Sequence, residues 1–230
     1  MDQGVVAHRI EVGGTVQGVG FRPFVWRLAT ELRITGAVRN AGGLVEIDAY
    51  GSADALARMA ARLRTEAPPQ ASVESVTVRP LPDADPVPDA GFRVADSGTH
   101  RTTDRLFPPD LAICPDCLAE LADPGDRRYR YPFINCTGCG PRATIIDSLP
   151  YDRPSTTMVD FALCPACLVE YTDPADRRFH AEPVACPACG PTLRWVSGPD
   201  AAPGGDAVTG DAALRRAVAA LAGGWIVAVK

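Results

Sequence analysis

The sequence contains almost no lysine and no long hydrophobic segment. Its one lysine is Lys230, the last of 230 residues, so Schiff-base chemistry has no other candidate. No run of about 18 apolar residues occurs and no apolar signal segment opens the chain, so no membrane span or membrane partner is expected. A net charge of -5 argues against a nucleic-acid partner. A hydrophobic fraction of 46% is typical of a soluble chain of one or two domains.

Two common nucleotide-binding motifs are also missing from the glycine-rich stretch at residues 13–22. No Gly-Lys-Ser/Thr follows it, which excludes a P-loop, and Gly18-x-Gly20-x-x-Pro23 lacks the third glycine of the dinucleotide fingerprint. What remains is a loop between a strand pattern and a helix pattern, where backbone amides can surround an anion. A turn without a ligand is the alternative, because such loops are common. Arg22 favours the anion site, since a guanidinium matches the oxygens of a phosphoryl group.

The first hundred residues alternate between strand and helix patterns. Strands are predicted at residues 8–12, 35–40, 44–50, 73–78 and 92–94, one helix is expected to open at Pro23, and Ser52 is expected to cap another. The order β-α-β-β-α-β predicts the α+β class in its ferredoxin-like arrangement, with one antiparallel sheet and two helices on one face.

All eight cysteines lie in two copies of the pattern C-x2-C-x18-C-x2-C. The copies are fifty residues apart, and 14 of 28 aligned residues are identical, which indicates an internal duplication. Two knuckles of this spacing complete a closed tetrahedral zinc site, which holds structure and leaves no position for a catalytic water. The sequence therefore predicts two zinc ions, one bound by Cys114, Cys117, Cys136 and Cys139, the other by Cys164, Cys167, Cys186 and Cys189.

Other interpretations of these cysteines stay open at this point. The even number permits disulfides, and four thiolates can also hold an iron–sulfur cluster, although the spacing favours zinc knuckles. Sequential pairing follows from the duplication, but interleaved pairing is possible. His180 aligns with Arg130, which cannot bind a metal, so His180 is expected to be a surface residue. The Asp-Arg-Arg clusters at 126–128 and 176–178 are expected to form ion pairs inside their own loops.

The N-terminal motifs resemble the acylphosphatase signature. The similarity rests on residues 14–22, Gly-Thr-Val-Gln-Gly-Val-Gly-Phe-Arg, followed by Val-Arg-Asn at 38–40, and the predicted strand order is that family's fold. The resemblance implies that the phosphate-binding groups belong to Gln17, Gly18, Val19, Gly20, Phe21 and Arg22. It also implies that Arg22 clamps the phosphoryl group and that Asn40 positions the attacking water.

The cysteine block extends the resemblance to the HypF family of carbamoyltransferases, through residues 126–136 and Leu-Pro-Tyr-Asp-Arg-Pro at 149–154. That family implies a cytoplasmic enzyme with an acyl phosphate phosphohydrolase module. It cleaves carbamoyl phosphate, uses ATP with magnesium to form carbamoyl adenylate in a YrdC-like domain, and transfers the carbamoyl group to the C-terminal cysteine of HypE. The product becomes a cyanide ligand of nickel–iron hydrogenase. In that setting the zinc block is a rigid spacer.

Four segments are expected on this basis. They are an acylphosphatase-like domain at residues 1–97, a double zinc-finger domain at 98–195, a linker at 196–210, and a truncated start of the YrdC-like domain at 211–230, with a helix capped by Asp211 and a strand at 225–229. A different function class remains as the alternative. In it, the fingers are a binding module and the N-terminal domain senses anions without catalysis.

Overall fold

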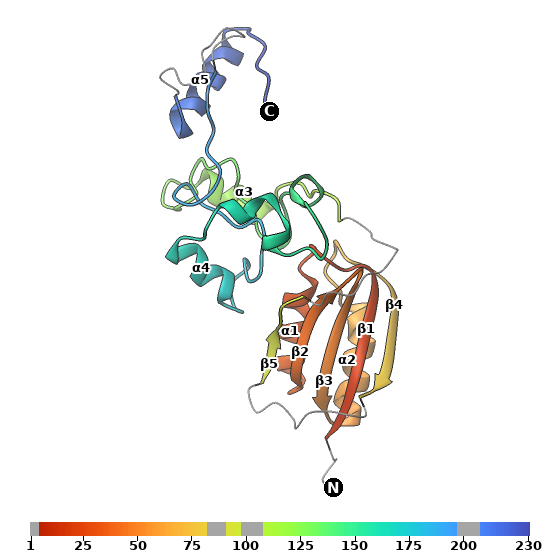
Figure 1. Cartoon of the computed structure of the whole chain (residues 1–230). Helices are drawn as coiled ribbons and strands as arrows, with labels where there is room; N and C mark the ends of the chain where they lie inside the picture. Colours follow the sequence, from red (N-terminus) through yellow and green to blue (C-terminus); the bar gives the residue numbers. More distant parts are fainter. Residues whose placement is uncertain (1–4, 82–90, 98–107, 197–207) are drawn as a thin grey trace.

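The structure of the protein, a computed structural model, describes residues 5–81, 91–97, 108–196 and 208–230. Figure 1 shows three successive parts: a sheet with its helices, a coil-rich region that contains both cysteine sets, and a last helix at the far end. The loop expected after Pro80 and most of the expected linker at 196–210 lie outside the described residues. The domain boundaries at 97 and 195 stay predictions.

The sheet has five strands in the order β4-β1-β3-β2-β5. The N-terminal elements are β1 (Val6–Thr15), α1 (Phe21–Glu31), β2 (Thr35–Ala41), β3 (Leu44–Gly51), α2 (Ala53–Thr65), β4 (Ser72–Pro80) and β5 (Phe92–Val94). This confirms the ferredoxin-like order. The sheet is antiparallel except at one edge, where β5 runs parallel to β2, so the expectation of a wholly antiparallel sheet is wrong there.

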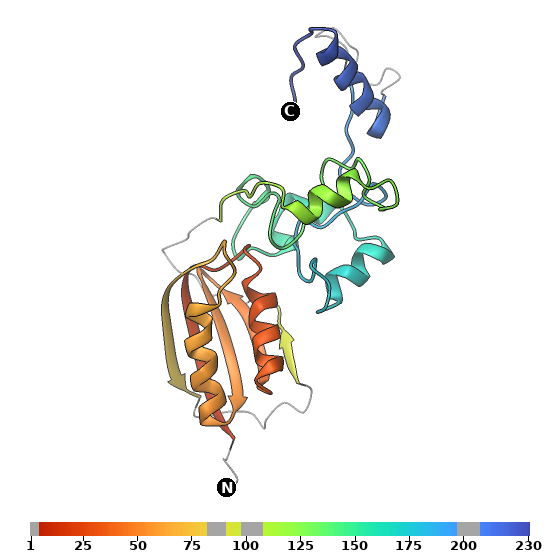
Figure 2. The same cartoon turned by 180° about the vertical axis from the view of Figure 1, so that it is seen from behind.

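The core of this domain lies between the sheet and the two helices, which cover one face (Figure 2). Ile10 and Ile47 of the sheet and Val25, Leu56 and Met59 of the helices are 2% exposed or less. α2 begins as predicted, because Ser52 accepts a hydrogen bond from the Ala55 amide at 3.2 Å. α1 begins at Phe21, two residues before the expected start, so its N-terminus opens directly from the glycine loop.

The duplication in the sequence is also a duplication in the structure. α3 (Pro115–Ala122) and α4 (Pro165–Thr172) each begin directly after the first cysteine of a copy, with proline at the first position. Between the copies lie three short 3₁₀ helices, η1 (Ala143–Ile145), η2 (Arg153–Ser155) and η3 (Thr157–Asp160).

The last helix, α5 (Gly210–Ala222), confirms the expected helix but not its cap. Thr209 is the N-cap, and Asp211 instead pairs with Arg130 and Arg215. The strand expected at 225–229 is wrong, because no neighbouring strand among the described residues pairs with it. Within the described parts of the chain, every helix is too short or too polar to cross a membrane.

Candidate functional site

The cysteines form two compact clusters, one from each copy. In the first cluster, the sulfur of Cys136 lies 3.7 Å from that of Cys114 and 3.8 Å from that of Cys139. The second cluster repeats the 3.7 Å distances around Cys186. A tetrahedron with bonds of about 2.3 Å has edges of about 3.8 Å, so both clusters fit a zinc ion. The pairing is sequential, as the duplication predicts, and His180 belongs to neither cluster.

Each copy supports the cysteine cluster of the other copy. Arg127 donates to the Cys167 sulfur at 3.3 Å, and Arg177 donates to the Cys117 sulfur at 3.1 Å. Arg127 pairs with Glu170 of the second copy, and Arg177 pairs with Glu120 of the first copy in the same way. The expectation of ion pairs inside each loop is therefore wrong. The arginines connect the two copies and place positive charge beside thiolates that would be negative around a metal.

The adjacent glutamates are held in their charged form. Burial by itself raises the pKa of Glu170, but hydrogen bonds from Arg128 and Arg127 outweigh it and lower that pKa to about 2. Arg178 forms the matching contact with Glu120.

The glycine loop at residues 17–20 ends β1 and opens α1. Gly18 and Gly20 have φ angles of 68° and 74°, a left-handed conformation that glycine adopts without strain. Within the described part of the chain, the backbone N–H groups of residues 17–22 donate to no acceptor. The Gln17 side chain fixes the loop to the β2–β3 turn by donating to the carbonyls of Gly42 and Leu44, at 3.0 and 2.9 Å. The result is a group of unpaired amides at a helix N-terminus, as an anion site requires.

Arg22 lies in the first turn of α1, buried beside this loop. Its Nη1 donates to Asp152 at 2.7 Å, and its Nη2 donates to Glu182 at 2.7 Å. Burial alone would lower the pKa of the guanidinium, but the carboxylates of Glu182 and Asp152 raise it above its ordinary value. The cation expected to clamp a phosphoryl group is thus paired with two carboxylates from the cysteine-rich region.

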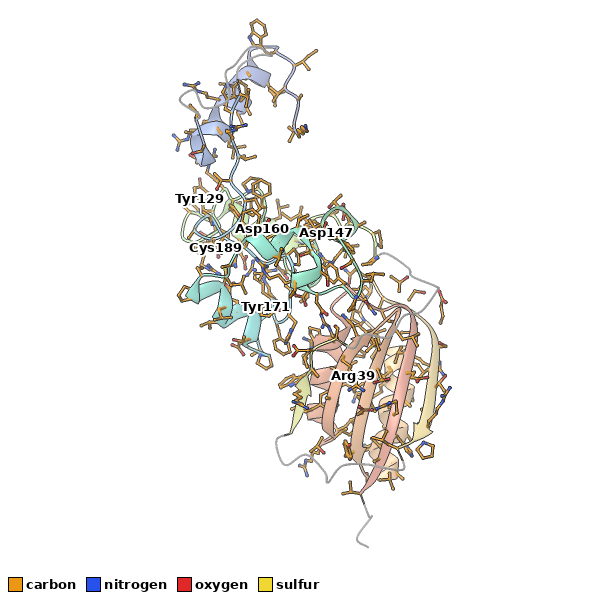
Figure 3. The ribbon with its side chains drawn as sticks, viewed as in Figure 1. Arg39, Tyr129, Asp147, Asp160, Tyr171 and Cys189 are labelled. Atoms are coloured by element: carbon orange, nitrogen blue, oxygen red, sulfur yellow. The ribbon has the colours of Figure 1, made fainter. Side chains whose placement is uncertain are left out.

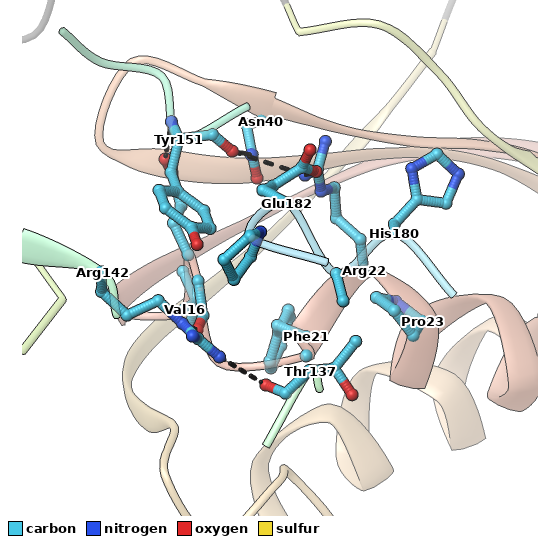
Figure 4. Close-up of a pocket in the computed structure, with 15 residues that line it drawn as sticks. Val16, Phe21, Arg22, Pro23, Asn40, Thr137, Arg142, Tyr151, His180 and Glu182 are labelled. Atoms are coloured by element: carbon cyan, nitrogen blue, oxygen red, sulfur yellow. Dashed lines mark hydrogen bonds and ion pairs between the residues drawn. The ribbon is translucent and has the colours of Figure 1, made fainter. Parts of the chain in front are cut away.

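Asn40, near the end of β2, lines the same pocket and is 1% exposed. Its Nδ2 donates to the Tyr151 carbonyl at 3.1 Å, whereas its Oδ1 is buried without a hydrogen-bond partner (Figure 4). The structure therefore brings Asn40, Arg22 and the glycine loop together. One N–H of the amide donates to the Tyr151 carbonyl, and the amide oxygen is without a partner.

The pocket lies between the sheet domain and the cysteine-rich region, with residues of both copies in its lining. Its volume is about 20 Å³, room for one or two water molecules. His180 and Glu182 line it from the second copy (Figure 4). His180 packs against Tyr171 and Phe179, and burial, followed by the nearby Arg22, lowers its pKa to about 4. His180 was expected to be a surface residue, but it is half-buried and lines this pocket.

Three charged residues at this site were not predicted from the sequence: Glu182 and Arg142, which line the pocket, and Asp152, which pairs with Arg22. Arg142 donates to the carbonyls of Gly18, Thr137 and Cys139, so it links the first cysteine cluster to the glycine loop. A signal for Glu182 exists in the duplication. The aligned residue of the first copy is Pro132, so a buried acid replaces a residue that cannot be charged.

Comparisons with known proteins agree with this geometry. A family model described as acylphosphatase matches residues 8–94, and one described as HypF finger matches residues 113–146 and 163–196. The acylphosphatase of Alkalilimnicola ehrlichii is 43% identical over 89 residues, which cover 38% of this chain and 96% of that protein.

Larger relatives share both parts. Carbamoyltransferase HypF2 of Cupriavidus necator is 52% identical over 151 residues, which cover 65% of this chain and 18% of that protein. A crystal structure of full-length HypF in the phosphate- and nucleotide-bound form matches with a TM-score of 0.81 and 37% identity, over 96% of this chain and 28% of that one.

Fold and site thus define an acylphosphatase domain joined to a pair of four-cysteine fingers. The chain belongs to the HypF family of carbamoyltransferases. The matched region spans about a fifth of the length of the curated carbamoyltransferases.

Proposed function

We propose that this chain cleaves carbamoyl phosphate at the pocket formed by the glycine loop, Arg22 and Asn40. The observation that carries the proposal is the set of unpaired amides at residues 17–22 beside a buried guanidinium. Amides and a fixed cation together bind a phosphoryl group and stabilise the charge on its equatorial oxygens. A related full-length HypF, solved in a phosphate-bound form, supports this choice of ligand.

The reaction needs positioning more than a strong base. Water attacks phosphorus, the bond between phosphorus and the carbamoyl oxygen breaks, and carbamate leaves with the electron pair. The products are carbamate, phosphate and one proton released to solvent. The transition state is loose, so Arg22 and the loop amides contribute mainly electrostatic stabilisation. The free Oδ1 of Asn40 accepts a hydrogen bond from the attacking water.

Binding requires the pocket, which here has room for one or two water molecules, to widen, and it requires Arg22 to exchange one of its carboxylate partners for the phosphoryl group. Asp152 is the candidate, because its side chain is 21% exposed and can turn toward solvent. Glu182, at 1% exposure, is fixed.

The remaining steps belong to the longer relatives. In this proposal, ATP with magnesium converts carbamate to carbamoyl adenylate, and the carbamoyl group passes to the C-terminal cysteine of HypE for cyanide ligand synthesis. Residues 211–230 would begin the YrdC-like domain. The two zinc ions hold the fingers as a rigid spacer, and reduced cysteines of this kind fit the cytoplasm.

The test is phosphate release from carbamoyl phosphate by the purified zinc-loaded chain, compared with Arg22→Ala. Loss of the guanidinium should lower kcat/KM at least about a hundredfold, or ~3 kcal/mol, with both zinc ions retained. Arg58→Gln, an exposed arginine on α2, is the matched control and should keep full activity. If the wild-type chain binds phosphate but releases none from carbamoyl phosphate, the anion-sensing alternative holds.

A further inference from the structure

Glu182 is a buried carboxylate that the hydrolysis step does not use. It lines the pocket from the second copy, and its side chain is 1% exposed. Burying a carboxylate costs stability unless it is fully paired, and an apolar residue of similar size would often be as stable. The first copy folds with Pro132 at the aligned position. The fold of a finger therefore does not require an acid here.

The two oxygens of Glu182 have different roles. Oε2 accepts from the Arg153 amide and the Tyr171 hydroxyl, both at 2.9 Å, which fixes the carboxylate. Figure 3 shows Tyr171 on the side of the finger region that faces the sheet. Oε1 accepts only from Arg22 among the described residues, at 2.7 Å, and a carboxylate oxygen can accept two hydrogen bonds. Oε1 thus has an open acceptor position that faces the site.

This acceptor position matches the part of the substrate that the loop amides and Arg22 do not bind. Glu182 lines the same pocket as the loop amides and contacts Arg22 directly, so it lies within reach of the acyl end of a compound whose phosphoryl group is held by these residues. A carbamoyl group carries an amine with two N–H donors there, whereas an acetyl group carries a methyl. A carboxylate can accept a hydrogen bond from the amine, but it forms none with the methyl group.

We propose that Glu182 is a specificity-determining residue that accepts a hydrogen bond from the carbamoyl amine. The second finger then supplies the amine recognition of a site whose phosphate recognition comes from the sheet domain. The proposal rests on the proposed function and adds a prediction of its own, namely that the preference for carbamoyl phosphate over acetyl phosphate resides in the finger.

The experiment compares kcat/KM for carbamoyl phosphate and acetyl phosphate in the wild type and in Glu182→Gln. The donors at Oε2 require an acceptor, so the glutamine oxygen takes that place and its NH₂ group faces the site. In this variant the NH₂ group of the glutamine faces the carbamoyl amine, and two hydrogen-bond donors cannot pair. The kcat/KM for carbamoyl phosphate divided by that for acetyl phosphate should fall roughly 10- to 100-fold. The matched control is Glu66→Gln, an exposed glutamate on the sheet domain that should leave the ratio unchanged.

Tyr171→Phe is a second variant in case Glu182→Gln does not fold, which a zinc content below two ions would reveal. It removes one bond that fixes Oε2 and should lower the ratio in the same direction but less. A wild-type chain without preference, or variants in which both substrates change equally, would overturn the role of Glu182 and leave the proposed function intact. A wild type that hydrolyses neither substrate would overturn the proposed function itself.

Discussion

Asn40 has one amide atom paired and one free, and this asymmetry defines what the residue can do. Its nitrogen is used by the Tyr151 carbonyl, while its oxygen is buried without a partner. A buried unsatisfied acceptor costs stability, so it is retained where it serves a ligand or a water. The position beside Arg22 makes a hydrogen bond to the attacking water the best use of that oxygen.

Asn40→Ala should therefore separate catalysis from binding. We expect turnover of carbamoyl phosphate to fall at least about tenfold, because the water loses its acceptor. Affinity for inorganic phosphate should change little, because the proposed anion site consists of Arg22 and the amides of residues 17–22. Turnover is measured by phosphate release and affinity by calorimetry. If both quantities fall together, or neither changes, Asn40 is a structural residue of the β2–β3 turn.

At the residue scale, sequence reasoning reached the local features and missed the distant ones. The glycine loop, Arg22 and Asn40 lie within one short motif pair, so their proximity follows from a known strand order. Glu182 and Asp152 contact Arg22 across 160 and 130 residues of chain. No periodicity or propensity carries such information, because docking between two domains depends on the shapes of both surfaces.

At the element scale, the fingers are coupled through their arginines. Each cysteine cluster receives a hydrogen bond from the Asp-Arg-Arg segment of the other copy. Glu170 of α4 pairs with Arg127, and Glu120 of α3 pairs with Arg177. Such contacts outside the ligand set tune metal affinity. The sequence showed the repeat but not these contacts between the copies, because an arginine next to an aspartate in the sequence predicts an ion pair inside its own loop.

These contacts between the copies predict crossed effects of mutation. Arg127→Gln should speed zinc loss from the second copy's cysteines roughly tenfold, and Arg177→Gln should do so for the first copy's cysteines. Mass spectrometry of cysteine alkylation over time identifies which set is exposed first. Arg215→Gln, an exposed arginine on α5, is the control. Faster alkylation of the cysteines in the mutated copy itself would contradict the crossed arrangement.

At the scale of the whole molecule, the two parts depend on different sources of stability. The sheet domain has a core of aliphatic side chains from both helices and all of the central strands. The finger region has a smaller cluster in which cysteines are prominent, so metal binding supplies much of its folding free energy. The pocket lies between the two, with its outer wall on the metal-dependent side.

Removal of metal should therefore dismantle the pocket wall and leave the sheet. The intact chain should contain two zinc ions; a content near one ion, or iron, would refute the two sites. With a chelator, we expect the far-UV signal of the sheet to persist while Trp26 fluorescence changes, because its ring packs against Phe179 at 5.9 Å. Hydrolysis of acetyl phosphate should continue, since Arg22, Asn40 and the loop all belong to the sheet domain, and the preference for carbamoyl phosphate should disappear with Glu182. Loss of the sheet signal together with the zinc would instead show that both parts unfold as one unit.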